Sequence, residues 1–283
     1  MNFLYCGDKN IVDGLFISIL SLLKNSKNDL NIYVLTVNIN NKNYNIEPVP
    51  NKYIDFLNEK VKETNTNNFV KKIDITEIFE KEIPVNNMNT YFTPCCMLRL
   101  FADEVSELPN KILYLDTDVV CRQDCSEFYN QDIKDYEMVG ALDYYGKWFF
   151  KQKAFKFDYL NSGVLLLNLD KIRETGLFRI SRERCKNKKM FMPDQSSLNK
   201  LSTNKKIVSR KYNEQRKLQD DTVFQHFTTS FRFFPVFHKL TVKPWEVDKV
   251  HNKLKIYEYD DILNEYELEK AKAEVKEEDV INA

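Results

Sequence analysis

The sequence predicts an α/β fold with a mixed, mostly parallel central sheet flanked by helices. The apolar run at residues 112–115 is continuous rather than alternating, which is typical of a strand buried on both faces of a parallel sheet. Segments with strand composition also alternate with segments of helical periodicity, as they do in doubly wound sheets. We therefore expect the run at residues 112–115 to form a central strand.

Composition limits the classes of protein that fit the chain. Its 283 residues are 43% hydrophobic and 30% charged, enough for one large α/β domain or two small ones. The 42 basic residues balance the 42 acidic ones, so net charge favours neither nucleic acid nor a membrane surface as a partner. The start, MNFLYCGDKN, lacks the features of a secretion signal, and the apolar residues 15–23 are too few to span a bilayer.

The six cysteines are expected to be reduced, and the protein to be cytoplasmic, because the sequence shows no export signal. Cys121 and Cys125 have the spacing of half a zinc site. A second close Cys/His pair is missing, so we expect these two to be small buried residues.

The first part of the chain contains three predicted strand–helix units. The opening unit is arranged as in nucleotide-binding α/β proteins, but it has neither a GxGxxG fingerprint nor a P-loop. Asp8 and Asn10 follow its strand and can hydrogen-bond a base or ribose, although a turn is the simpler interpretation. The Asn-rich residues 38–45 are expected to form a loop. The expected strands are Asn2–Cys6, residues 30–37 and Phe69–Asp74, and the expected helices are residues 13–23, Asn51–Thr64 and a short acidic helix ending near Glu80.

Residues 93–105 predict a helix with Pro94 in its first turn. Arg99 is the only basic residue in this helix and has apolar neighbours, so it needs a partner. It can form a structural ion pair, or it can reach the carboxylates after the central strand and a phosphate bound there. The sequence leaves both possibilities open.

Two carboxylates, Asp116 and Asp118, directly follow the central strand. In parallel sheets, ligands bind at the carboxyl ends of the strands. A charged carboxylate at the edge of a core is costly without compensation, which a divalent cation and its phosphate ligands can provide. An Asp-rich turn is the simpler alternative, but two aspartates around one Thr favour a metal–phosphate site.

Further polar residues accompany the expected strands of the second half. Asp143 directly follows the strand Met138–Leu142, and Asn-Ser-Gly at residues 161–163 leads into a buried strand at residues 164–169. Asp194 and Gln195 lie at an expected helix start, where an Asp can serve merely as a cap and dipole partner.

The rest of the chain predicts a strand at residues 223–227, which carries His226, followed by a Phe-rich segment. Residues 260–283 predict a charged helix without a strong apolar face, which we expect to be peripheral or frayed. We find no repeat and no linker composition. The economical division is one domain at residues 1–250 and a charged helical appendage at residues 251–283.

The chain resembles the family-8 retaining glycosyltransferases, the group that contains glycogenin and bacterial lipopolysaccharide galactosyl- and glucosyltransferases. The resemblance runs from about Asn2 to Trp245 and rests on motifs in the family's order and approximate spacing. Each motif is weak alone, whereas the ordered set is specific. The motifs are GDKN near the start, LRLF at residues 98–101, YLDTD at 114–118, LNSGVLLLNL at 160–169, PDQ at 193–195, HF at 226–227 and KPW at 243–245.

This resemblance implies a GT-A-type nucleotide-sugar-binding fold, so that residues 1–250 would be a single GT-A-like domain. It implies a UDP-sugar donor, UDP-glucose or UDP-galactose, and a Mn²⁺ or Mg²⁺ ion. The implied reaction is transfer of the hexose, with retention of configuration, to a hydroxyl of a cell-surface glycan or glycolipid precursor. Membrane contact would then be peripheral and only through the acceptor.

The resemblance also implies roles for individual residues. Asp116, Asp118 and His226 would bind the metal, with Asp116 also near the sugar and ribose, and Asp8 and Asn10 would bind uridine. Arg99, Asp143, Asn161, Gly163, Asp194 and Gln195 would line the sugar pocket, with Gln195, Asp194 and Asp143 as the candidate catalytic residues, and Lys243 would hold the diphosphate.

The chain departs from the family at the metal-binding histidine. The family's spacing from that histidine to KPW is short, and His238 lies much closer to KPW than His226 does. Strand context (TVFQHF) favours His226, whereas proximity favours His238. We predict His226 as the ligand.

Retention by double displacement needs a nucleophile on the far face of the sugar. The family's residue at that position corresponds to Gln195, which is a poor nucleophile. We therefore expect attack from the front face, with a diphosphate oxygen as the base and Asp194 binding sugar hydroxyls. The expected acceptor surfaces are the aromatic, basic residues 144–157, including Trp148, Phe149 and Phe150, and residues 228–242.

Two other functions fit parts of the sequence. Residues 116–120 match the DxDx[TV] motif of haloacid-dehalogenase-type phosphatases, and Asp220-Asp221 could be their later acidic pair. That motif usually lies near a chain's start, and a phosphatase leaves KPW, NSG and PDQ unexplained. The other alternative is a non-catalytic UDP-sugar-binding protein, although both aspartates and a suitable histidine are present.

Overall fold

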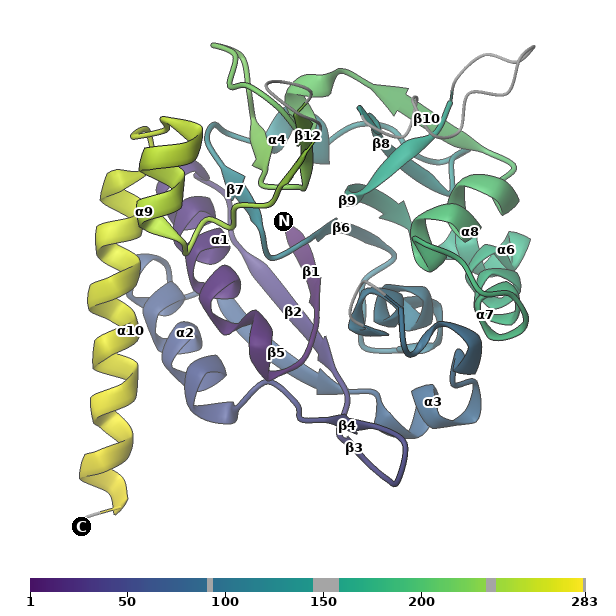
Figure 1. Ribbon diagram of the computed structural model, residues 1–283, viewed down its shortest axis with the longest axis horizontal. Helices are drawn as coiled ribbons and strands as arrows, with labels where there is room; N and C mark the ends of the chain where they lie inside the picture. Colours follow the sequence, from purple (N-terminus) through teal and green to yellow (C-terminus); the bar gives the residue numbers. More distant parts are fainter. Residues whose placement is uncertain (91–93, 145–157, 233–237, 282–283) are drawn as a thin grey trace.

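The computed structural model describes residues 1–90, 94–144, 158–232 and 238–281, and its central feature is a twisted seven-stranded sheet (Figure 1). One strand, β9, is antiparallel to both of its neighbours, and the other neighbouring pairs are parallel. This confirms the predicted α/β fold with a mixed, mostly parallel sheet. The strand order is β10 (Lys205–Val208), β8 (Met138–Leu142), β9 (Leu160–Asn168), β6 (Lys111–Leu115), β1 (Asn2–Cys6), β2 (Asn31–Thr36) and β5 (Phe69–Asp74).

Helices cover both faces of this sheet, so that the central strands are buried on both sides. In β1, Phe3 and Tyr5 pack into one hydrophobic cluster, while Leu4 and Cys6 pack into the other. The first cluster is covered by α1 (Val12–Asn25), α2 (Asn51–Thr64) and α10 (Asp260–Ile281). The second is covered by α3 (Thr76–Lys81), the 3-10 helix η3 (Pro94–Glu104), α6 (Leu169–Thr175), α7 (Leu177–Asn187) and α8 (Pro193–Leu201).

Smaller elements complete the described chain, and one pair of them matters for the site. Strand β11 (Phe224–His226) pairs antiparallel with β7 (Val119–Cys121), so that His226 lies opposite Val119, directly after Asp118. The other small elements are η1 (Lys9–Ile11), β3 (Ile39–Asn40), β4 (Asn45–Ile46), η2 (Val85–Asn87), α4 (Ser126–Tyr129), η4 (Arg210–Tyr212), β12 (Ser230–Arg232), β13 (His238–Leu240), α9 (Val247–Lys249) and the π-helix η5 (Val250–Leu254).

Three local expectations differ from the structure. Strand β9 begins at Leu160 rather than at residue 164, because Leu160 pairs with Leu142 at the end of β8. The Asn-rich loop contains the short hairpin β3–β4, in which Ile39 and Ile46 pair and are buried. The helix that carries Arg99 is a 3-10 helix, η3, with Pro94 at its start as expected.

The C-terminal helix α10 lies along α1 and α2, whereas the sequence predicted a peripheral or frayed helix (Figure 1). Its few apolar residues recur three, four and seven positions apart and are buried against the first cluster. The Tyr266 ring meets the Phe16 ring at 6.4 Å, and Lys270 Nζ lies 2.5 Å from Asp13 on α1. The division at residue 250 remains a prediction. The buried apolar residues of this end of the chain are Tyr259, Ile262, Leu263, Tyr266 and Ala273.

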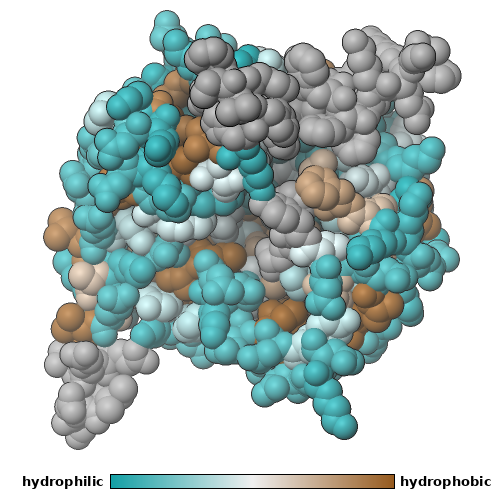
Figure 2. Space-filling model, viewed as in Figure 1, coloured by the Kyte–Doolittle hydropathy of each residue, from teal (hydrophilic) through white to brown (hydrophobic). Residues whose placement is uncertain are grey.

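On the face seen in Figure 2, hydrophilic residues cover most of the coloured surface, and hydrophobic residues lie in small separate areas. Within the described ranges, no helix combines the length and the apolar character needed to cross a bilayer.

Candidate active site

The polar residues singled out in the sequence gather at one edge of the sheet. Asp116 and Asp143 directly follow the parallel strands β6 and β8, and Asp8 comes two residues after β1. Strand β9 runs the opposite way, so its first residues, 160–163, lie at the same edge. The sequence therefore brings these residues together through strand order alone, as expected for ligand sites of open α/β sheets.

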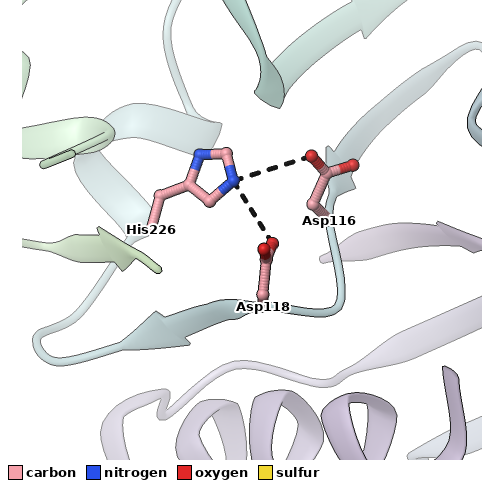
Figure 3. A group of neighbouring side chains, drawn as sticks. All are labelled: Asp116, Asp118 and His226. Atoms are coloured by element: carbon pink, nitrogen blue, oxygen red, sulfur yellow. Dashed lines mark ion pairs between the residues drawn. The ribbon is translucent and has the colours of Figure 1, made fainter. Parts of the chain in front are cut away.

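Asp116, Asp118 and His226 point toward one another and form the centre of the site (Figure 3). Nε2 of His226 lies 3.2 Å from Oδ1 of Asp118 and 3.7 Å from Oδ2 of Asp116. One donor atom from each residue lies within 4.8 Å of the other two. The backbone fixes both aspartates, because the amide of Asp116 donates to the Gly163 carbonyl and the Asp118 carbonyl accepts from Phe227.

Lys243 joins this cluster by an ion pair with the Asp118 carboxylate. Burial alone would raise the pKa of Asp118, but Lys243 and His226 lower it below its usual range. Burial would likewise lower the pKa values of His226 and Lys243, and the Asp118 carboxylate raises both above their ordinary values. The buried carboxylate is therefore ionised, and Lys243 and His226 stabilise its charged form.

Asn213 contacts the imidazole of His226 at Nδ1, the ring nitrogen that does not face the two carboxylates. Its Oδ1 lies 3.2 Å from Nδ1 of His226, and its Nδ2 donates to Oδ1 of Asn161 at 2.9 Å. A hydrogen bond at Nδ1 leaves Nε2 facing the two carboxylates, which is how a metal-binding histidine is usually oriented. Asn213 could not be identified from the sequence, since it lies in a loop without a motif and its contacts arise only from tertiary structure.

Arg99 is buried, and its guanidinium links three parts of the site. Nη2 donates to Oδ1 of Asp116 at 2.8 Å, and Nη1 donates to the Ser162 carbonyl at 2.6 Å. Nε lies 3.4 Å from Oδ2 of Asp194, and the guanidinium carbon lies 3.8 Å from the centre of the Tyr114 ring. The Tyr114 hydroxyl also donates to Asp116 at 2.6 Å. Of the two possibilities that the sequence left open, Arg99 thus forms an ion pair and reaches Asp116.

The sugar-pocket candidates form a second hydrogen-bonded group beside the first. Nε2 of Gln195 donates to Oδ2 of Asp143 at 2.7 Å, and Oε1 of Gln195 accepts from the Ser162 amide at 2.9 Å. Nδ2 of Asn161 donates to the same Asp143 oxygen at 3.3 Å, and the Ser162 hydroxyl donates to Asp194 at 3.3 Å. Ser162 was part of a quoted motif but had no assigned role, and here it connects Asp194 and Gln195.

Gly163 is required by close packing between β9 and the Asp–Asp–His cluster. A Cβ at this position would lie 2.2 Å from Cε1 and 2.7 Å from Nδ1 of His226, and 2.9 Å from Oδ2 of Asp116. No larger residue fits without displacing a member of the cluster. Only glycine lets β9 pass this close to His226.

The remaining candidates lie in less constrained positions. Oδ1 of Asp8 accepts from the Asn10 amide at 3.0 Å at the start of η1, a turn contact that leaves the Asn10 side chain exposed. His238 is the first residue of β13. The aromatic residues Trp148, Phe149 and Phe150 lie outside the described residues, as do residues 233–237 of the second acceptor segment.

The donor set fits a hard divalent cation. Two carboxylates and one neutral imidazole nitrogen are ligands that Mn²⁺ accepts, and carboxylates also suit Mg²⁺. In the described part of the chain, the group that contains Asp116 and Asp118 is completed by His226 and not by Asp220 or Asp221, which are exposed. The acidic pair that a phosphatase would need is therefore not assembled.

Comparison with known proteins agrees with this geometry. The profile of glycosyl transferase family 8 matches residues 2–248. A putative glycosyltransferase of Haemophilus influenzae is 27% identical over 227 residues, which are 75% of this chain and 63% of that protein. The chain thus spans less than two thirds of that relative. A lipopolysaccharide 1,2-glucosyltransferase of Escherichia coli is 27% identical over 249 residues, 78% of this chain and 69% of the relative.

Solved structures of the galactosyltransferase LgtC share the fold. An active-site mutant of LgtC superposes with a TM-score of 0.68 at 18% identity, covering 93% of this chain and 94% of LgtC. LgtC in complex with donor and acceptor sugar analogues gives a TM-score of 0.64 at 17% identity, covering 94% and 95%. The fold is therefore GT-A, as the motifs led us to expect.

Proposed function

The chain belongs to glycosyl transferase family 8, and on this premise we propose that it is a metal-dependent, retaining hexosyltransferase. In this proposal it moves glucose or galactose from a UDP-sugar to a hydroxyl of an acceptor. The observation that carries the proposal is the Asp116–Asp118–His226 cluster at the carboxyl edge of the sheet, in which Asp118 and His226 are buried and Lys243 pairs with Asp118.

The cluster supplies what cleavage of a sugar–diphosphate bond requires. A Mn²⁺ or Mg²⁺ ion bound there would stabilise the negative charge that develops on the leaving diphosphate. Asp116, Asp118 and Nε2 of His226 would hold the ion. The Lys243 ammonium lies against Asp118, within the same charged group, and would bind a phosphate oxygen. Asp8 and Asn10, beyond the adjacent strand β1, would bind uridine.

The second hydrogen-bonded group would hold the sugar. Asp143, Asn161 and Asp194 offer carboxylate and amide groups to its hydroxyls. Arg99 connects Asp194 with Asp116 of the metal-binding cluster by ion pairs. Both ends of the Gln195 amide are already bonded, to Asp143 and to the Ser162 amide. Its position suits orienting the sugar better than attacking it.

Retention then follows most simply from front-face attack. The Asp194 carboxylate is engaged by Arg99 Nε and by the Ser162 hydroxyl, which makes it a weak nucleophile. The acceptor hydroxyl would attack the anomeric carbon on the face that the diphosphate leaves, and a diphosphate oxygen would take its proton. Mass spectrometry of the enzyme trapped with donor checks this step, since a sugar covalently attached to Asp194 or Gln195 would contradict it.

The acceptor in this proposal is a cell-surface glycan or glycolipid precursor, reached on the cytoplasmic side. The name of the Escherichia coli relative, a lipopolysaccharide glucosyltransferase, supports the acceptor class. Cys121 and Cys125 are buried, as expected for small core residues. Contact with a membrane would be through the acceptor alone.

Nucleoside diphosphate release is the direct test. The enzyme is incubated with UDP-glucose, UDP-galactose, UDP-N-acetylglucosamine or GDP-mannose, with and without Mn²⁺. We expect metal-dependent release from one UDP-hexose, lost in Asp116→Asn and Asp118→Asn. The matched control is Asp220→Asn, which removes the same charge from an exposed loop and should retain activity.

Each failure has its own meaning. Binding of a UDP-sugar without any release from it would favour the non-catalytic binding protein. Hydrolysis of an aryl phosphate without nucleoside diphosphate release from any UDP-sugar would favour a phosphatase, even though Asp220 and Asp221 are exposed.

A further inference from the structure

Two arginines lie over Tyr144, the residue that directly follows the sugar-pocket candidate Asp143. The guanidinium carbon of Arg216 is 4.4 Å from the centre of the Tyr144 ring, and that of Arg210 is 5.3 Å from it. Nη1 of Arg216 donates to the Tyr144 hydroxyl at 2.7 Å. The function proposed above uses none of these three side chains.

Their place in the fold is next to the sugar pocket, on the side away from the nucleotide. Arg210 follows β10, which is parallel to β8, so the carboxyl ends of both strands meet at the edge that carries the site. Gln215 connects the segment Arg210–Arg216 to the end of β8 by two hydrogen bonds. Its Oε1 accepts from the Tyr144 amide at 2.9 Å, and its Nε2 donates to the Leu142 carbonyl at 3.1 Å.

Strand order then assigns this position to the acceptor. Along the edge, β1 carries the uridine candidates, β6 carries the metal candidates, and β8 with β9 carries the sugar candidates. The next strand is β10, followed by Arg210. A group bound at Arg210 and Arg216 would therefore lie across the sugar from the nucleotide, where the second substrate must approach.

The charge of this segment is not balanced locally, although the whole chain is neutral. Glu214 is buried, and its Oε1 accepts from the Arg210 guanidinium and from the Arg216 amide. Among the residues that the structure describes, no carboxylate lies within ion-pair distance of the Arg216 guanidinium, which is exposed. The Glu214 carboxylate thus pairs with the side chain of Arg210 but not with that of Arg216, and Lys217 adds a further exposed charge.

We propose that Arg216 and Arg210 bind a phosphate group of the acceptor, an inference that rests on the proposed transferase function. A guanidinium presents paired N–H donors that match two phosphate oxygens, and it stays charged at any physiological pH. The hydrogen bond to Tyr144 fixes the orientation of Arg216 before the acceptor arrives. The acceptor class would be a phosphate-bearing glycan or a glycan on a phospholipid-type carrier.

The test uses the full chain saturated with Mn²⁺ and UDP, so that the donor site is filled. The probes are glucose 1-phosphate and its neutral counterpart methyl α-glucoside, with affinities measured by titration calorimetry. We expect the phosphorylated sugar to bind about tenfold or more tightly than the neutral one, as charge-assisted hydrogen bonds imply. Arg216→Gln should abolish this difference, and Arg216→Lys, which keeps the charge but loses the planar fork, should restore only part of it.

Lys217→Gln is the matched control, because it removes the same charge one residue away without touching Tyr144. It should keep the preference for the phosphorylated sugar. If Lys217→Gln loses as much as Arg216→Gln, or if the wild-type protein binds both sugars equally, the phosphate site at Tyr144 is refuted. Hydrolysis of UDP-hexose by the wild-type protein separates the proposed transferase function from the proposed phosphate site. If the protein does not hydrolyse UDP-hexose, the transferase function is refuted. If it does so but shows no preference for the phosphorylated sugar, only the phosphate site is refuted.

Vesicle sedimentation distinguishes the two sources of phosphate. The protein is spun with phosphatidylcholine vesicles, with or without phosphatidylglycerol. Binding that needs phosphatidylglycerol and Arg216 assigns the phosphate to a lipid carrier. Binding of glucose 1-phosphate without binding to these vesicles assigns it to the glycan, and binding to vesicles without a preference for glucose 1-phosphate refutes the site at Tyr144.

Discussion

Replacing Gly163 by alanine should disable the proposed metal site while leaving most of the fold intact. The added Cβ would lie 2.2 Å from Cε1 of His226 and 2.9 Å from Oδ2 of Asp116. Carbon atoms that are not bonded attract each other best at roughly 3.5–4.0 Å, so the imidazole must move by about 1 Å or more. The ring cannot turn away freely, because it is buried and its Nδ1 is held by Asn213.

The magnitude follows from this displacement. Metal–donor bonds of about 2.0–2.2 Å tolerate errors of a few tenths of an ångström, so a shift of this size removes His226 as a ligand. Losing only an outer partner of a ligand weakens metal binding roughly 10- to 100-fold, and losing the ligand itself should cost at least as much. Overpacking should also lower the free energy of unfolding by about 1–3 kcal/mol.

Titration calorimetry with Mn²⁺ and urea unfolding measure the two effects separately. The matched control is Gly140→Ala in β8, whose Cβ would lie 2.8 Å from Cδ2 of Leu165 and so overpacks the sheet away from the cluster. This control should lose stability but keep Mn²⁺ affinity. Close packing of Gly163 against His226 is not what preserves the metal site if Gly163→Ala binds Mn²⁺ as tightly as the wild-type protein, or if Gly140→Ala loses as much affinity.

Three further predictions concern the support of the site and the packing of the C-terminal helix. Asn213→Ala should weaken Mn²⁺ binding roughly 10- to 100-fold, since the imidazole loses its orienting partner; an unchanged titration would mean that Asn213 does not orient His226. The pKa of His226 is raised in the metal-free protein, so a proton must leave before Nε2 can bind an ion, and Mn²⁺ affinity should rise with pH until that pKa is passed. The raised pKa of His226 also stabilises the folded, metal-free protein. This stabilisation is complete below the unfolded pKa of about 6.5 and is lost as the pH rises through the raised folded pKa. A Mn²⁺ affinity that does not change between pH 5.5 and 8 would contradict the role of His226 as a metal ligand. Tyr266→Ala should lower the free energy of unfolding by about 3 kcal/mol, whereas Leu268→Ala on the exposed side of α10 should change it by less than about 0.5 kcal/mol, measured by urea unfolding.

Sequence reasoning recovers those parts of the fold that local patterns encode. The strands Phe69–Asp74 and Met138–Leu142 have the predicted bounds because apolar runs between turn residues define them. The start of β9 is different, since pairing with Leu142 rather than local composition determines it. The burial of α10 was also missed, because a few apolar residues at helical spacing among many charges give a weak signal.

In the candidate site, too, some residues can be identified from local sequence and others only from tertiary structure. Asp116 and Asp118 stand out in the sequence because they follow a continuous apolar run, and the structure brings them together with His226. Strand context favoured His226, and β11 pairs with β7 beside Asp118; the role of His226 as a metal ligand stays a prediction. Asn213 and the arginines over Tyr144 could not be found in the same way, because their roles depend on which loops the sheet order brings together.

The pairing of β7 with β11 has a consequence for the whole chain. Two of the proposed donors are two residues apart, whereas His226 comes 108 positions after Asp118, so an ion held by all three would be a reversible cross-link across a long loop. An unfolded chain does not present these donors together. Each tenfold excess of ion over its dissociation constant would then add about 1.4 kcal/mol to the stability of the native state. The supply of divalent cations would thus govern how long the folded protein persists as well as how fast it works.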